Sequence, residues 1–342
     1  MMGIALALSG LAVTAGSGAG AGGPEPRRFE AVETHMGSPF RIILYTHDEA
    51  AASRGLRAAF ARVAALDRAL SDYDPESELM RLCDAAGGPP VKASGDLFEV
   101  LARSRAMADR SGGAFDPTVA PAVRLWRRAR RERKLPDPDA IRKALDRVGA
   151  SKMTLDPAAR TVRLEPGVKL DLGGIAKGYA SQEALGTLRA MGLPVALVAG
   201  AGDIAAGDPP PGRAGWSVDV APLDGPGAGR PERTLRLRNL AVSTSGDAER
   251  FVEIGGVRYS HIVDPTTGLG LTTRMSVTVV ARDGATADAL DTAACVLGPE
   301  RGLALVASTP GAEALFVRRS PAGDERFETP GFRSLVEPAP AP

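Results

Sequence analysis

His261 lies in the segment of this chain that is best suited to acid–base chemistry. The segment reads Tyr259-Ser-His-Ile-Val-Asp-Pro-Thr-Thr-Gly268, and it follows a short run typical of a β-strand. A neutral imidazole can accept a proton from a hydroxyl near physiological pH. Pro265 and Gly268 favour a tight turn that would hold the ring in place. His261 is therefore a candidate general base, although a histidine in such a turn can equally serve only to hydrogen-bond its loop.

A second group of polar side chains has the spacing of a metal site. Asp288, Asp291 and Thr292 are three and four residues apart, so they share one face of a helix that we expect over 285–297. Carboxylate and hydroxyl oxygens are hard ligands that suit Mg²⁺. The alternative is a solvated helix face with an acidic residue near the helix N-terminus.

A glycine-rich segment ends one apolar run and opens a helix that we expect over 176–191. It reads Asp171-Leu-Gly-Gly-Ile-Ala-Lys177. Backbone amides at the start of a helix attract phosphate oxygens, glycines let a ligand come close, and Lys177 adds a positive charge. The spacing is neither that of a P-loop nor that of the dinucleotide fingerprint. An ordinary strand–helix turn stays open as the alternative.

Two aromatic residues lie in polar, glycine-containing loops. Aromatic residues make up only 4% of the chain, and Tyr73 and Phe115 both follow this loop pattern. A ring in such a loop is a candidate to contact a flat ligand ring. Either ring could equally pack against its own loop.

The elements that must position these residues alternate between strand and helix patterns. Apolar spacing and turn residues predict helices, strands and hairpins along the whole chain. The expected helices cover 49–70, 97–108, 137–148, 176–191, 285–297 and 299–307, the strands 40–45, 168–172, 195–198, 216–220, 235–237, 241–244 and 275–281, and the hairpins 153–164 and 251–259. The pattern predicts one mixed α/β or α+β domain over about 30–320.

Both ends of the chain look separate from this domain. An apolar run at 4–13 is followed by small residues up to 23, as in a secretory signal, but no Lys or Arg precedes Arg27. Residues 1–23 are therefore expected to be an export leader, with a disordered extension as the alternative. The proline-rich tail 337–342 is expected to be disordered.

Composition excludes several classes of function. The formal net charge of the 342-residue chain is +1, which gives no support to nucleic-acid binding. The basic run 124–134 reads as a solvated helix face, because stacking aromatics are scarce around it. The two cysteines, Cys83 and Cys295, lack the neighbours of a zinc or iron–sulfur site.

The order of these motifs along the chain is itself specific. In addition to the segments above, the series contains His35-Met-Gly-Ser38, Ser71-Asp-Tyr-Asp74 with Ser77-Glu-Leu79, Gly113-Ala-Phe-Asp-Pro-Thr118, Gly202-Asp-Ile204 and Ser243-Thr-Ser-Gly-Asp247. With these motifs in this order the chain resembles the FAD:protein FMN transferases, the ApbE family of flavin transferases. The resemblance covers roughly 33–298 and implies a single ApbE-like (T-fold-like) domain with mixed sheets and flanking helices.

The resemblance also implies roles for individual residues. His261 matches the proposed catalytic base. The metal would be held by the carbonyl of Gly174 and by Asp288 and Thr292, while Asp291 stands where only some members carry a further acidic ligand. The positions that match FAD contacts are Met36, Tyr73, Ala114, Phe115, Asp116, Asp171, Lys177 and Ile262.

The activity that the resemblance implies is Mg²⁺-dependent transfer of FMN from FAD to a Thr or Ser of an acceptor flavoprotein, with release of AMP. The implied acceptor is a membrane redox subunit. The implied location is the periplasm or, for an exported protein, the membrane, with the cytoplasm as the alternative. Two alternatives stay open, because they need the same pocket. One is an FAD pyrophosphatase that gives FMN and AMP, and the other is a flavin-binding protein without turnover.

Overall fold

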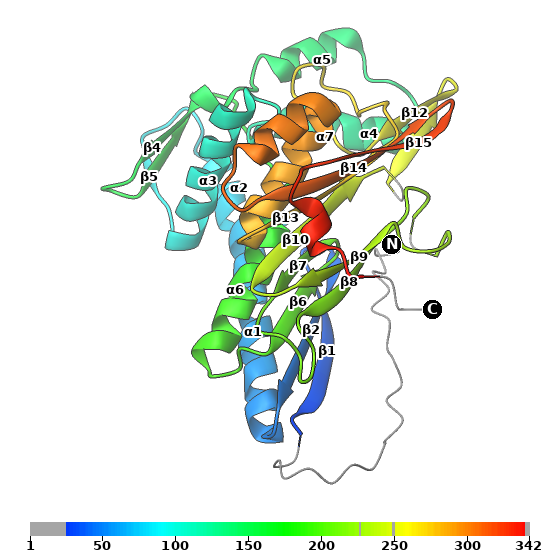
Figure 1. Ribbon diagram of the computed structural model, residues 1–342. Coiled ribbons are helices and arrows are strands. Elements are labelled where there is room, and N and C mark those ends of the chain that lie inside the picture. The colour runs from blue at the N-terminus through cyan, green and yellow to red at the C-terminus, as the bar shows by residue number, and fades with distance from the viewer. Residues whose placement is uncertain (1–24, 226, 248–249, 339–342) are drawn as a thin grey trace.

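An antiparallel sheet forms the centre of the molecule (Figure 1). The computed structural model describes residues 25–338 except 226 and 248–249. The strands follow the order β1-β2-β6-β7-β10-β13-β14-β15, and each neighbouring pair is antiparallel. They are β1 (Arg27–His35), β2 (Ser38–Thr46), β6 (Ala196–Gly200), β7 (Asp203–Ala206), β10 (Leu240–Gly246), β13 (Met275–Ala281), β14 (Glu313–Ser320) and β15 (Gly323–Glu328).

Three long helices cover one face of this sheet. They are α1 (Glu49–Leu70), α6 (Ala176–Ala190) and α7 (Gly284–Ala307), and their apolar sides build the largest core with the strands. Asp48 caps α1, since its side chain accepts from the backbone N–H groups of Ala50 and Ala51. Helix α7 is broken at Gly298, whose φ is 75° and which precedes Pro299. The break separates the two helices that the sequence predicted.

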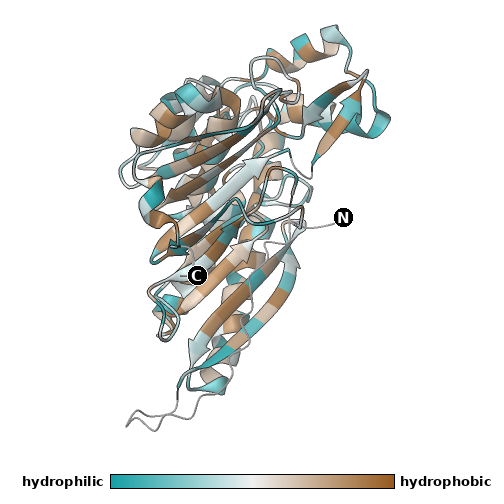
Figure 2. Ribbon diagram, turned by 45° about the vertical axis from the view of Figure 1, so that its right-hand side comes forward, coloured by the Kyte–Doolittle hydropathy of each residue, from teal (hydrophilic) through white to brown (hydrophobic). Residues whose placement is uncertain are grey.

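The opposite face of the sheet is covered by a hairpin and a short 3₁₀ helix. The hairpin consists of β8 (Trp216–Val220) and β9 (Arg233–Leu237), and η2 (Phe332–Leu335) lies beside it. They enclose a second core with residues of the central strands, and Phe332 is fully buried in it. Strand β13 is buried along its whole length, because both faces of the sheet are covered there. Figure 2 shows the apolar character of the central strands.

A smaller unit lies beyond the end of the sheet. It contains α4 (Ala120–Glu132), α5 (Pro138–Leu145), β11 (Phe251–Ile254) and β12 (Val257–Ser260), which lie near one another in Figure 1. Trp126 is its central residue: the ring packs against Tyr259, and Nε1 donates a 2.9 Å hydrogen bond to the Ser260 carbonyl. The remaining elements are α2 (Glu78–Asp84), α3 (Gly95–Ser111), η1 (Ala150–Lys152), β3 (Val91–Lys92), β4 (Met153–Asp156) and β5 (Thr161–Leu164).

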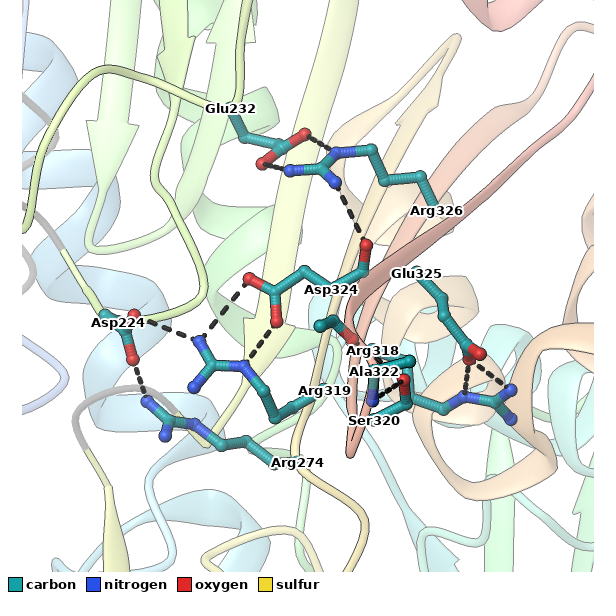
Figure 3. Close-up of polar contacts among 11 residues, drawn as sticks. Asp224, Glu232, Arg274, Arg318, Arg319, Ser320, Ala322, Asp324, Glu325 and Arg326 are labelled. Carbon is teal, nitrogen blue, oxygen red and sulfur yellow. Dashed lines mark hydrogen bonds and ion pairs between the residues drawn. The ribbon is translucent and has the colours of Figure 1, made fainter.

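The loop between β8 and β9 is fastened to the sheet by ion pairs. Asp224 pairs with Arg274 and, at 3.0 Å, with Arg319, while Glu232 holds Arg326 at 2.9 Å (Figure 3). The loop begins at Ala221, which borders the large cavity described below. The network therefore fixes one wall of that cavity relative to β14 and β15.

The predicted fold class is confirmed, with corrections to single elements. The expected strand 168–172 is wrong: it is a loop, because Leu170 N donates to Cys83 Sγ (3.2 Å) and Asp171 N to the Pro117 carbonyl (2.8 Å) rather than to a neighbouring strand. The expected mixed sheets are antiparallel in all the described pairings.

The folded unit extends beyond both expected bounds. Strand β1 begins at Arg27 and β15 ends at Glu328. Glu337, which the sequence placed in a disordered tail, is held by β8 and β9, since its N–H donates to the Thr234 carbonyl (2.8 Å) and its carboxylate accepts from Ser217 (2.7 Å). The expected leader 1–23 and residues 339–342 lie outside the described residues. Within the described part of the chain, no helix is long and apolar enough to cross a membrane.

Candidate active site

A cavity of about 1060 Å³ lies where the ends of the central strands meet α4, α7 and the start of α6. It brings together segments that are far apart in sequence. Every site residue predicted from the sequence lines it except Asp291: Met36, Tyr73, Ala114, Phe115, Asp116, Asp171, Gly174, Lys177, His261, Ile262, Asp288 and Thr292. The structure therefore gathers in one place the candidates that the sequence offered separately.

Met36 reaches the cavity from the turn between β1 and β2. The φ angles of Met36 and Gly37 are 50° and 67°, as the two-residue turn of a twisted hairpin requires. Methionine rarely adopts this conformation. It is held there because its N–H donates a 2.8 Å hydrogen bond to Asp67 Oδ2 on α1.

The inner end of the cavity is formed where the start of α6 meets α7. Gly178 N donates a 2.9 Å hydrogen bond to Asp288 Oδ2. The helices approach so closely that a Cβ on Gly178 would lie 2.1 Å from the Gly284 carbonyl oxygen. A Cβ on Gly174 would lie 2.8 Å from Thr292 Oγ1. Only glycine at these two positions lets the loop before α6 and the first turn of α6 lie against Thr292 and Asp288.

Three carboxyl groups are buried at this inner end: Asp203, Asp288 and Asp291. Burial, together with the charge of Asp203, raises the pKa of Asp288 to about 7. Lys177 is the cation beside them, with Nζ 3.5 Å from Asp203 Oδ2. Burial lowers the pKa of Lys177, but the carboxylates of Asp288 and Asp203 outweigh burial, and its pKa is raised overall.

Asp291 lies behind the wall of the cavity and is fully buried. Ser243 Oγ is 2.6 Å from Asp203 Oδ1 and 2.6 Å from Asp291 Oδ2. One hydroxyl proton cannot serve two acceptors, so one of these carboxyls carries a proton itself. Burial and the neighbouring Asp288 and Asp203 raise the pKa of Asp291 well above its usual value. Asp291 is therefore the protonated group.

These residues fit a magnesium ion. Among the described residues, no group of three His, Cys, Asp or Glu side chains could hold a metal. A cation at this end would have to use the carboxylate of Asp288, the hydroxyl of Thr292 and a backbone carbonyl, for which Gly174 is the neighbouring residue. Mg²⁺ is commonly held by one or two carboxylates, with water and substrate phosphate completing its shell. An added cation would also offset the buried negative charge beside Lys177.

His261 follows β12 and lines the same cavity. Its backbone is fixed by a 2.9 Å hydrogen bond from its N–H to the Arg250 carbonyl. The ring atom Nδ1 is buried without a partner among the described residues, so Nε2 is the nitrogen available to a hydroxyl. Burial and the positive charges of Arg250 and Arg130 lower the pKa of His261 to about 3. The imidazole is therefore neutral and can accept a proton.

The carboxylate of Asp116 serves its own loop. It accepts from Thr118 N (2.8 Å) and Thr118 Oγ1 (2.5 Å) and from Ala150 N (2.9 Å). Burial raises its pKa in spite of these bonds. Asp116 therefore joins its own loop to η1, while Phe115 is held at the cavity wall by a 3.0 Å hydrogen bond from its N–H to Ser111 Oγ.

The outer end of the cavity contains arginines that the sequence analysis read as a solvated helix face. Arg127 pairs with Asp72 at 2.6 Å and with Asp171 at 3.0 Å, and its guanidinium lies over the exposed ring of Tyr73, 4.5 Å from the ring centroid. Arg130 and Arg250 also line the cavity. The hydrophobic spacing of Ala122, Trp126 and Ala129 could have shown that the opposite side of α4 is buried. No local pattern shows that Arg127 and Arg130 face a cavity.

The fold and the site define a single-domain α+β protein, with a cavity suited to phosphate and a cation at one end and a neutral histidine on its wall. The family model of the ApbE family matches residues 36–316, and the chain belongs to this family. It is 35% identical over 321 residues to an FAD:protein FMN transferase from Treponema pallidum, covering 89% of this chain and 88% of the relative. A second such transferase, from Klebsiella pneumoniae, is 33% identical and covers 83% and 87%.

Solved structures agree with this assignment. The ApbE protein from Thermotoga maritima is 29% identical and superposes with a TM-score of 0.81, covering 91% of this chain and all of that one. A flavin transferase ApbE from Pseudomonas stutzeri in its apo form is 28% identical, with a TM-score of 0.81 over 93% of this chain and 99% of that one. The resemblance inferred from the motifs is thereby confirmed.

Proposed function

We propose that this protein is an Mg²⁺-dependent FAD:protein FMN transferase. It would take FAD as substrate and attach FMN through a phosphoester to a Thr or Ser of an acceptor flavoprotein, with AMP as the other product. The observation that carries this proposal is a single cavity in which a phosphate-suited glycine loop, the oxygens of Asp288 and Thr292, and a neutral His261 occur together. The names of the related transferases support it.

Different residues along the cavity would bind different parts of FAD and activate the acceptor. The loop before α6 would bind the pyrophosphate, since its amides and Lys177 provide positive potential. Tyr73, Phe115 and Met36 would contact the rings of FAD. Mg²⁺, when bound, would supply charge neutralisation to the pyrophosphate. His261 would take the proton of the acceptor hydroxyl, whose oxygen bonds to the FMN-side phosphorus while the bond from that phosphorus to the AMP oxygen breaks.

Bound FAD should make His261 a stronger base. A pKa of about 3 makes the free imidazole a weak base. The pyrophosphate brings negative charge close to Arg130, Arg250 and Lys177, the cations that help to lower this pKa. Binding of FAD should therefore raise the pKa of His261. The chain has only three histidines, so a proton NMR titration with and without FAD can follow this one directly.

A single incubation separates the proposed function from its alternatives. The purified protein is mixed with FAD, Mg²⁺ and a threonine-containing acceptor peptide. FMN-labelled peptide and AMP support the transferase. Free FMN and AMP, equal with and without peptide, would instead indicate an FAD pyrophosphatase. FAD that is bound but unchanged would indicate a flavin-binding protein without turnover.

We further propose that the protein acts outside the cytoplasm on a membrane-bound redox subunit. The support is the apolar run at 4–13 followed by small residues. Cell fractionation with N-terminal sequencing tests this part alone. Recovery in the cytoplasm with an intact Met1 would contradict it and would leave the chemistry untouched.

A further inference from the structure

A second hollow opens beside the active-site cavity, between α4 and the β11–β12 hairpin. Its volume is about 760 Å³, and its lining is Arg127, Arg130, Arg131, Arg133, Phe251, Val252 and Glu253. Arg127 and Arg130 line both this hollow and the active-site cavity. The hollow, which we call the arginine groove, thus shares a wall with the site of the reaction.

The arginines of the groove differ from other arginines on the same surface. Arg130, Arg131 and Arg133 form no ion pair with any described residue, whereas Arg128 on the same helix pairs with Glu132 at 2.7 Å. The Nε atom of Arg130 is buried without a hydrogen-bond partner in the described part of the chain. A buried donor without a partner is costly, so a ligand that supplies an acceptor there is favoured.

The position of Arg133 also needs explanation. It ends α4 with a φ of 52°, in the left-handed region where glycine is the usual residue. The dipole of α4 accounts for cations near its C-terminus. It does not account for a charged side chain at a strained position on the edge of a groove that also contains the partly exposed ring of Phe251.

We propose that the arginine groove binds an acidic segment of the acceptor protein, beside the Thr or Ser that receives FMN. This inference rests on the proposed function, and it assigns to the acceptor a chemical feature: aspartates or glutamates close to the modified residue. Carboxylates would pair with Arg130, Arg131 and Arg133. The shared wall places such a segment next to the cavity that holds His261.

The groove fits a protein segment better than the other polyanions. Single-stranded nucleic acid needs open aromatic faces for stacking. Phe251 is the aromatic residue of the groove, and the guanidinium of Arg258 covers its ring at 3.2 Å from the centroid. A flat membrane surface would contact the exposed side chains of Arg131 and Arg133 without entering the hollow that Arg130 also lines.

The test compares two threonine peptides on the full-length protein with FAD and Mg²⁺. One peptide carries aspartates beside the threonine, and the other carries asparagines at the same places. We expect KM for the acidic peptide to be about tenfold lower, since a few exposed charge pairs together reach this ratio. The difference should shrink as salt is raised. Fluorescence anisotropy of the labelled peptides measures binding independently of transfer.

Reversing the charge of groove arginines then tests whether the preference for the acidic peptide arises in the groove. In the double variant Arg131→Glu, Arg133→Glu the preference for the acidic peptide should disappear, with FAD affinity unchanged. The matched control is Arg128→Glu, Arg142→Glu, which removes the same charge from exposed arginines outside the groove and should keep the preference.

Each outcome bears on one proposal. Equal KM and equal anisotropy for the two peptides, or a preference that survives the groove variant, would overturn the arginine groove as an acceptor site. Groove variants that lose binding to vesicles with anionic lipids, but keep the peptide preference, would reassign the surface to a membrane. Absence of transfer by the wild-type protein, with acidic peptide still bound in the groove, would count against the transferase activity and in favour of the groove.

Discussion

The two ends of the active-site cavity are lined by side chains of opposite charge. At the inner end, Asp203, Asp288 and Asp291 are buried together, with Lys177 as the neighbouring cation. At the outer end, Arg130 and Arg250 face the cavity, and Arg127 is neutralised by Asp72 and Asp171. The inner end carries an excess of negative charge and suits a cation, whereas the outer end carries an excess of positive charge and suits an anionic substrate.

A cavity charged in this way would suit a metal cation at one end and a pyrophosphate at the other. Like charges raise the free energy of each end when it is empty, and a ligand of opposite charge lowers it. The raised pKa of Asp288 and the lowered pKa of His261 are two signs of this arrangement. Variants that change the charge or the base at one end should therefore differ in their effects from variants at the other.

The largest effect is expected from His261→Ala. Loss of a general base usually lowers the rate by about 10²–10⁴-fold, so kcat for FMN transfer should fall by this factor. FAD affinity should change little, because the other cavity residues remain. Stopped assays of labelled peptide together with FAD titrations measure both. The control is His47→Ala, on the exposed residue after β2. Near wild-type kcat in His261→Ala would remove this residue from the mechanism.

The next largest effect is expected from Asp288→Asn at the inner end. The amide keeps the size of the side chain but removes the charge that would hold Mg²⁺. Loss of several kcal/mol of charge stabilisation corresponds to about 10³-fold in rate. A titration of activity with Mg²⁺ should show a much weaker apparent affinity. An unchanged Mg²⁺ dependence would mean that the cation binds elsewhere.

The pH dependence of Mg²⁺ binding follows from the same residue. Protons and Mg²⁺ compete for Asp288, so the apparent Mg²⁺ affinity should rise as the pH passes through about 7. Without Mg²⁺, Asp288 of the folded protein retains a proton that the unfolded chain loses near 3.8, the ordinary pKa of an aspartate, so its contribution to the free energy of unfolding should fall as the pH rises from there to about 7. His261, whose pKa is lowered to about 3, contributes the opposite slope up to about 6.5. The contribution of Asp288 is therefore measured as the difference in thermal stability between the Mg²⁺-free wild type and Asp288→Asn, which both contain His261. A difference that does not fall as the pH rises would contradict the raised pKa of Asp288.

Variants of Asp291 distinguish between two roles of this residue, a buried neutral carboxyl group and a metal ligand. As a protonated group it is mimicked by an amide, so Asp291→Asn should lose activity by about tenfold or less, well below the loss in Asp288→Asn. Asp291→Ala should instead lower the free energy of unfolding by about 1–3 kcal/mol, because it removes the buried partner of the Ser243 and Ser245 hydroxyls and leaves Ser243 with Asp203 alone. Equal losses of Mg²⁺ affinity in Asp288→Asn and Asp291→Asn would show that both carboxylates bind the cation.

The sequence was more informative about the inner end than about the outer end, for a physical reason. The residues of the inner end lie at strand–helix junctions and on one helix face, where spacing along the chain determines proximity. Asp288 and Thr292 could therefore be grouped before the structure was known. The contact of Gly178 with the Gly284 backbone, and the Ser243 bridge between two carboxyls, join distant segments and have no local signal.

At the outer end, spacing along the chain does not determine which side chains face the cavity. The arginines after Arg124 form a run that is typical of a solvated helix. Whether such a helix faces water or a cavity depends on Trp126, which packs on the distant Tyr259. The edge strands β1 and β15 were missed too, since most of their residues are polar or exposed and the apolar signal is weak. Strand β14 was also missed, although four consecutive apolar residues are buried in it.

The smallest effect is expected from relieving backbone strain at two residues with a positive φ. It also tests whether the strain at Arg133 serves acceptor binding. Arg133 and Ala201 both have a positive φ, 52° and 56°, and they lie at the outer groove and at the inner cavity respectively. Glycine relieves this strain, so Arg133→Gly and Ala201→Gly should each raise the free energy of unfolding by up to about 1 kcal/mol, less the entropy that glycine costs. Chemical denaturation measures this change. If the arginine is kept at its position for acceptor binding, only Arg133→Gly should also raise KM for an acidic acceptor peptide. A stabilised Arg133→Gly with unchanged KM would leave the strain at that position without a role in acceptor binding.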